Sequence, residues 1–167
     1  MEDMLDADRL RQFREQTLYR LLIRATRAET NEMVSRIRKR GYPDLMVSYP
    51  VLLANLDTEG TNITTLASKA GVSRQAASQL IREIEARGYL DLRPDPRDGR
   101  AVIVGRTARG QRLLRDALDV VSELEGEYAE RLGRKRFDSM RKSLSTLLDH
   151  IDPGGTLNAG RFGGSSA

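Results

Sequence analysis

The chain has 167 residues, a length that suits one hydrophobic core and makes two independent domains unlikely. With 31% charged residues, three Phe, five Tyr and no Trp, the composition is typical of helices with solvated outer faces and excludes a disordered chain. The net charge of +4 favours an anionic partner, and the absence of cysteine excludes disulfides, thiol redox sensing and cysteine metal sites.

One long amphipathic helix is predicted over residues 8–40, because apolar side chains recur there three or four residues apart. Gly41 suits the C-terminal cap of this helix. A second, short helix should follow, with Ser48 as its cap and Pro50 in its first turn, where a missing N–H does no harm.

Two further helices with a tight turn between them are predicted next. The first extends over residues 63–72, capped by Thr64 and broken at Gly71, and Ser73 then caps a helix that continues to Arg87. Two helices joined by a short turn that contains glycine are typical of the helix-turn-helix unit.

A β-hairpin and two long helices complete the pattern. Residues 89–93 and 101–106 are rich in β-formers and predict two short strands around a charged tip. Thr107 then caps a long helix that ends near Gly133, and a last helix ends at Ile151.

The helix that begins after Ser73 is predicted to have a polar face and a packing face. About 100° of rotation per residue places on the polar face Gln75, Ser78, Gln79 and Arg82, with Arg74 at its margin. The opposite face carries Ala76, Ala77, Leu80, Ile84 and Arg87. Gln, Ser and Arg can match base edges in a major groove, although any amphipathic surface helix also has a polar face.

The hairpin tip is the second candidate for contact with DNA. Its turn, made by two prolines and a glycine, presents Arg97 and Arg100, which Asp95 and Asp98 can orient by ion pairing. An arginine on a narrow projection fits the negative potential of a minor groove. A salt-bridged surface turn without a function is the alternative.

Positive charge is concentrated in the segment that holds both candidates. Residues 61–112 contain ten Lys/Arg and five Asp/Glu, a net +5 that leaves −1 for the rest of the chain. A surface that faces phosphates would explain this, and a solvated arginine-rich face explains it equally well. There is no run of about 18 apolar residues and no apolar stretch of signal-peptide type in residues 1–9, so we expect a cytoplasmic, nucleoid-associated protein.

A set of residues with specific order and spacing extends from Ile63 through Leu114. Its members are Leu66, Ala67, Gly71, Val72, Ser73, Arg74, Gln75, Ala76, Glu85, Ala86, Arg87, Gly88, Tyr89, Arg93, Pro94, Asp95, Pro96, Arg97, Asp98, Gly99, Arg100, Ala101, Thr107, Gly110, Leu113 and Leu114. This set resembles the MarR family of multiple antibiotic resistance regulators, and the flanking helices extend the resemblance over about residues 8–151.

The resemblance implies a mainly α fold with a small β-hairpin, in one domain over residues 1–151. It places a winged helix-turn-helix core at 46–106 between dimerisation helices at 8–40 and 107–151. The glycine- and serine-rich residues 152–167 are predicted to form a flexible tail.

The implied function is that of a bacterial transcription regulator, expected to be a repressor, which binds double-stranded DNA as a homodimer. Two-fold symmetry predicts an inverted-repeat operator with half-sites roughly 10 base pairs apart. By resemblance, the residues expected at the DNA are Thr64, Ser73, Arg74, Gln75, Ser78, Gln79, Arg82, Arg93, Arg97 and Arg100. Among them Arg97 would enter the minor groove, and Arg100 would pair with a wing aspartate or contact phosphate.

The resemblance also implies a ligand site, since many relatives are released from DNA by a small aromatic molecule. That molecule binds where the long first helix meets the second helix and the helix after the hairpin. The candidate contacts on those segments are Tyr19, Arg20, Arg24, Tyr42 and Tyr49, although tyrosines there are equally explained as core or interface residues. His150, the single histidine, is expected at the surface, so neither a metal nor another cofactor is expected.

Other functions and assemblies compete with this interpretation. An enzyme is disfavoured because the chain has no cysteine, no histidine placed for catalysis and no glycine-rich phosphate loop. An architectural protein that coats any duplex, or an interaction module that has lost DNA binding, would share the fold. The apolar stripes of the terminal helices favour a homodimer, with an intramolecular bundle as the alternative.

Overall fold

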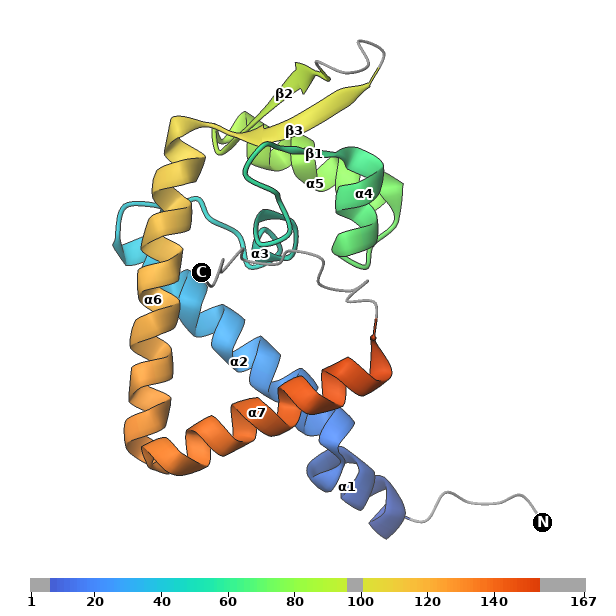
Figure 1. Cartoon of the computed structure of the whole chain (residues 1–167), viewed down its shortest axis with the longest axis vertical. Coiled ribbons are helices and arrows are strands. Elements are labelled where there is room, and N and C mark those ends of the chain that lie inside the picture. Colours follow the sequence, from blue (N-terminus) through green and yellow to red (C-terminus); the bar gives the residue numbers. More distant parts are fainter. Residues whose placement is uncertain (1–6, 96–100, 154–167) are drawn as a thin grey trace, which may run out of the picture.

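The computed structural model describes residues 7–95 and 101–153, which form seven helices and a three-stranded sheet (Figure 1). The helices are α1 (Ala7–Gln16), α2 (Leu18–Lys39), α3 (Pro50–Leu53), α4 (Ile63–Lys69), α5 (Arg74–Ala86), α6 (Ala108–Leu132) and α7 (Arg134–Ile151). The strands are β1 (Thr61–Asn62), β2 (Leu90–Pro94) and β3 (Val102–Arg106). The predicted fold, mainly helical with a winged helix-turn-helix core between long helices, is confirmed.

The prediction of one helix over residues 8–40 is wrong, because Thr17 separates α1 from α2. The backbone of Thr17 is extended, with φ −71° and ψ 140°, and its Oγ1 accepts a hydrogen bond from the N–H of Arg20 as the cap of α2. The same hydroxyl donates to the carbonyl of Phe13, 2.8 Å away, at the end of α1. The apolar spacing continues across this break, so periodicity could not reveal it.

The cap predicted for α3 is also wrong. Tyr49 occupies the cap position without a side-chain hydrogen bond, so Ser48 does not cap this helix. Pro50 does lie in the first turn, as predicted. The caps predicted at Ser73 and Thr107 are confirmed, since their side chains accept hydrogen bonds from the third N–H group beyond them.

Helix α4 begins at a different cap from the predicted Thr64. Asn62 is its N-cap, and the Oδ1 atom of Asn62 accepts a hydrogen bond from the N–H of Thr65 at 2.9 Å. Because Asn62 also ends β1, its extended backbone already has the conformation that a cap requires. The helix ends at Lys69, three residues before the predicted end at Val72.

The sheet has the order β1-β3-β2, and all its pairs are antiparallel. The predicted hairpin is confirmed, with Leu90 opposite Arg106 and Pro94 opposite Val102. The third strand, β1, was not predicted, because two residues are too few to show an alternating pattern. We call β2, β3 and the turn between them the wing.

The core joins the winged helix to α2 and α6. Its fully buried members with the largest side chains are Tyr49, Tyr89, Ile37, Leu45, Leu52, Leu66, Ile81, Ile84, Leu90, Leu124, Val34 and Val104. Helices α1 and α7 contribute little, since Phe137 is the single buried hydrophobic residue of their described part. No helix within residues 7–95 and 101–153 has the length and apolar character needed to cross a bilayer.

Candidate nucleic-acid interface

The turn between α4 and α5 has the geometry of a helix-turn-helix. Gly71 adopts a φ of +65°, a conformation that side-chain-bearing residues rarely adopt, and the N–H of Val72 donates back to the carbonyl of Ala67 at 3.0 Å. Ser73 follows at once as the N-cap of α5, accepting from the N–H of Ala76 at 3.1 Å. The predicted helix-turn-helix is therefore confirmed.

Helix α5 packs on a narrower stripe than the sequence suggested. The buried side chains are Ala77, Ile81 and Ile84, spaced four and three residues apart. Ala76, predicted to pack, is exposed, and Ile81 was missed. The packing face is therefore centred on Ile81. Successive residues lie about 100° apart around a helix, so a small error in the predicted centre of the face misplaces residues at its edge.

The opposite face of α5 is open to solvent. Arg74, Gln75, Gln79 and Arg82 are exposed, and Ser78 is half-buried. The Ser78 hydroxyl donates to the carbonyl of Arg74 at 2.8 Å, and Gln79 makes a long hydrogen bond of 3.4 Å to Glu83. Within the described part of the chain, Arg74, Gln75 and Arg82 have no hydrogen bond from their side chains. The structure therefore brings the five predicted side chains of α5 together, three of them with unused donors.

The wing begins beside this helix, and hydrogen bonds hold the part of it that approaches the turn. Arg93 is exposed and donates to the carbonyl of Glu59 at 2.9 Å, and the N–H of Asp95 donates to the carbonyl of Ala101 at 2.9 Å. The predicted tip residues Arg97, Asp98 and Arg100 lie outside the described residues. Thr64 is exposed in the first turn of α4, away from the cap position that was predicted for it.

Asp57 fixes the turn that leads from α3 into the helix-turn-helix, a role that sequence reasoning missed. Both carboxylate oxygens accept from Nζ of Lys69 at 2.7 Å, and one accepts from the hydroxyl of the buried Thr61 at 3.0 Å. Burial alone would raise the pKa of Asp57, but the hydrogen bonds from Lys69 and Thr61 outweigh it and lower the pKa.

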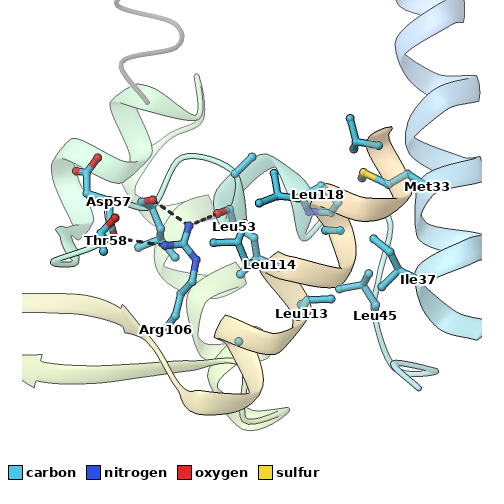
Figure 2. A pocket seen from close by; sticks show the side chains of 16 residues that line it. Met33, Ile37, Leu45, Leu53, Asp57, Thr58, Arg106, Leu113, Leu114 and Leu118 are labelled. Carbon is cyan, nitrogen blue, oxygen red and sulfur yellow. Dashed lines mark hydrogen bonds between the residues drawn. The ribbon is translucent and has the colours of Figure 1, made fainter. Parts of the chain in front are cut away.

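A cavity of about 540 Å³ lies where α2, α3 and α6 meet (Figure 2). Its wall is mostly apolar, with Met33 and Ile37 on the α2 side and Leu118 on α6. Arg106 forms part of its polar end and donates to the carbonyls of Leu53 and Leu56 at 2.8 and 2.9 Å. Burial lowers the pKa of this guanidinium.

The cavity lies at the predicted junction, but none of the five predicted ligand residues lines it. Tyr42 and Tyr49 are buried in the core, where the hydroxyl of Tyr42 donates to Asp116. Tyr19 and Arg24 are exposed and Arg20 is half-buried on the N-terminal half of α2. The residues that do line the cavity were missed because their apolar spacing is the same as that of a core.

The sequence of this winged helix matches a family model, described as MarR family, over residues 45–101. This segment extends from the loop before α3 to the end of the wing turn. This part of the chain is similar to the MarR family. The match covers the helix-turn-helix and the first strand of the wing. A search of curated proteins gave no match.

Solved MarR structures extend the likeness over most of the chain. A MarR-family regulator from Rhodococcus sp. RHA1 is 25% identical over 83% of this chain and 99% of its own, with a TM-score of 0.61. CouR from Rhodococcus jostii RHA1, bound to p-coumaroyl-CoA, is 25% identical over 83% of this chain and 94% of its own, with a TM-score of 0.63. The repressor CouR bound to a 23-mer DNA duplex is 23% identical over 87% and 99% of the two chains, with a TM-score of 0.64.

Proposed function

We propose that this protein is a MarR-family repressor that binds an inverted-repeat operator as a homodimer. The observation that carries the proposal is the exposed face of α5, where Arg74, Gln75 and Arg82 keep their donors and acceptors unused at the end of a helix-turn-helix. A major groove admits one helix, and these side chains can read base edges in it. Such a regulator would act in the cytoplasm, on the nucleoid.

We assign a role at the DNA to each predicted residue. On α5, Arg74, Gln75, Ser78, Gln79 and Arg82 would contact bases or nearby phosphates. The N–H groups at the start of α5, next to the cap Ser73, favour a phosphate, and Thr64 lies in the first turn of α4, where the N–H groups do the same. The wing would place Arg97 in the minor groove, with Arg93 and Arg100 at the backbone.

Exposed apolar side chains on the terminal helices support the homodimer. Those on α1, α2 and α7 are Phe13, Leu18, Tyr19, Leu21, Leu22, Met140, Leu148 and Ile151. They would be covered by a second copy of the chain, whereas an intramolecular bundle would bury them within one protomer. Two recognition helices related by a two-fold axis then require two half-sites about one helical turn apart.

The cavity between α2, α3 and α6 supports release by a small molecule. CouR, a relative of this chain, is known with p-coumaroyl-CoA bound. An apolar cavity of about 540 Å³ lies within the usual range of ligand pockets. We expect its occupant to have an apolar body, because apolar side chains form most of the wall.

Selection of duplexes from a random pool, followed by affinity measurements at matched salt, tests the proposal. The selected operator should bind at least about a thousandfold more tightly than a scrambled duplex of the same length and composition. Equal affinity for both duplexes would favour the architectural protein instead, and no binding to either would favour an interaction module.

A further inference from the structure

The first turn of α6 holds the C-terminal end of the recognition helix α5 through three successive backbone carbonyls. The bonds are from Nη1 of Arg109 to Arg87 at 2.9 Å, from Oγ1 of Thr107 to Gly88 at 2.6 Å, and from the N–H of Thr107 to Tyr89 at 3.1 Å. These carbonyls directly follow the last helical residue of α5. These bonds join the first turn of α6 to the end of α5.

Close packing reinforces these bonds. Gly110, also in the first turn of α6, lies so near the carbonyl oxygen of Tyr89 that a Cβ atom at this position would be 2.0 Å from it. A glycine is required here because no side chain fits between the helix and the backbone of Tyr89.

A half-buried polar cluster adds the loop between α2 and α3 to this joint. The hydroxyl of Tyr89 donates to Oδ1 of Asp44 at 2.5 Å, and Nη2 of Arg109 donates to the same oxygen at 2.8 Å. Arg109 also donates to the Tyr89 hydroxyl at 3.0 Å, and its guanidinium carbon lies 4.4 Å from the centre of the Tyr89 ring. We call Asp44, Tyr89 and Arg109 the Asp44 cluster.

Within the described residues, the Asp44 cluster is the last of four polar links between α2, with the loop after it, and α6. The other three are Arg36–Glu127, at 2.6 and 2.9 Å, Arg40–Glu123, at 2.6 and 2.7 Å, and Tyr42–Asp116. Those three bind α6 to α2 and its loop, and their polar groups make no hydrogen bond to the end of α5, although the ring of Tyr42 lies 6.2 Å from that of Tyr89. The Asp44 cluster alone among the four also includes Tyr89, at the end of α5.

We propose that the Asp44 cluster sets the angle of α5 relative to α2 and α6, and thereby the half-site spacing that the dimer accepts. This rests on the proposed function. The two recognition helices belong to different protomers, so their separation depends on how firmly each is joined to its own long helices. None of the three residues lies on the exposed face of α5, and they act as positioning residues. Loosening the joint relaxes the spacing requirement while the reading of bases within each half-site stays the same.

Two tyrosines give a matched pair of variants. Tyr89→Phe removes a hydroxyl that donates to Asp44 within the cluster, and Tyr42→Phe removes a hydroxyl that donates to Asp116 one link away. Both variants keep the two rings, which lie 6.2 Å apart, so they differ only in the hydroxyl that is lost. Asp44→Ala is a stronger version of the first change. The affinity of each protein is measured for the operator selected by the wild type, for operators whose half-sites are one base pair closer or farther apart, and for operators with one substituted base pair in a half-site.

A one-base-pair change of spacing rotates one half-site by about 35°, and we expect it to weaken the wild type and Tyr42→Phe about tenfold. For Tyr89→Phe and Asp44→Ala the spacing penalty should fall about threefold or more, while the penalty for a base substitution stays unchanged. Tyr89→Phe loses one oxygen atom only, so it keeps the test valid if Asp44→Ala does not fold.

An unchanged spacing penalty in both cluster variants would overturn the inference, as would an equal relaxation in Tyr42→Phe. A wild-type protein that selects no common operator would instead overturn the proposed function, so the two failures are distinguishable.

Discussion

At the scale of single residues, the contacts of Asp57 predict that the stability of the helix-turn-helix depends on acid pH. Its pKa is lowered from the ordinary value of 3.8 because Lys69 and Thr61 bind the ionised form. A carboxylate with a lowered folded-state pKa stabilises the fold above its unfolded-state pKa, and this stabilisation is lost as the pH falls through the folded-state value.

Asp57→Asn should therefore reduce the dependence of stability on acid pH. In the wild type, the free energy of unfolding is expected to decrease as the pH falls below about 4. The variant should be less stable near neutral pH and should show a shallower decrease in this range. Denaturant unfolding at a series of pH values measures both, and parallel curves for the two proteins would show that Asp57 makes no such contribution.

Gln75 tests base reading at the same scale, because its side chain is exposed on α5 and has no hydrogen bond within the described residues. Gln75→Ala should change the preference among operators that differ at one base pair by roughly 1 to 3 kcal/mol. Affinities for a set of single-substitution operators measure this change. A uniform loss across the whole set would assign Gln75 a positioning role.

At the scale of helices and strands, the predictions were most accurate at turn glycines and at serine or threonine caps. Gly71 and Ser73 predicted the turn and the start of α5, and Thr107 predicted the start of α6. Thr17 was missed as a cap because the apolar pattern continues past it. Asn62 was missed because Thr64, another residue that can cap a helix, lies two positions further on. Helical periodicity correctly predicted that Gln75, Gln79 and Arg82 are exposed on α5, but it placed Ala76 on the packing face.

The cavity and the Asp44 cluster could not be predicted in the same way. The cavity is lined by leucines and other apolar residues that a sequence pattern cannot distinguish from a core. The cluster joins residues 20 to 65 positions apart in the chain, and only the packing of α6 against the end of α5 brings them together.

Helix α6 contains two glycines that test its packing against α5. A Cβ atom at Gly110 would be 2.0 Å from the carbonyl oxygen of Tyr89, whereas one at Gly126 would meet nothing within 4 Å. Gly110→Ala should therefore destabilise the fold by about 1 to 3 kcal/mol. Gly126→Ala, the control, should stabilise it by up to about 1 kcal/mol, because alanine favours the helix.

Thermal and denaturant unfolding of the two variants measure these opposite effects. Equal stability of Gly110→Ala and the wild type would contradict the close contact between α6 and Tyr89.

At the scale of the whole molecule, the proposed dimer connects the exposed apolar residues of the terminal helices with the half-site spacing. Helices α1 and α7 bury little within one chain, and α6 connects α7 to the wing at its other end (Figure 1). A dimer formed through the terminal helices would therefore fix the separation of the two α5 helices.

A charged residue in the proposed interface should separate the protomers. Leu148, on α7, is 51% exposed, and Leu148→Asp should lower the fraction of dimer in sedimentation measurements and weaken operator binding. Val47 is 44% exposed in the loop before α3, and Val47→Asp should leave the dimer intact as a control. A wild-type chain that sediments as a monomer at the concentrations that bind operator would contradict the account.

The central claim is that two α5 helices enter successive major grooves on one face of the duplex. Protection of guanine N7 atoms from methylation on the selected operator tests it most directly, because these atoms lie in the major groove. We predict two clusters of protected guanines, roughly 10 base pairs apart from centre to centre. A single cluster, or weak protection spread evenly along the duplex, would contradict the claim.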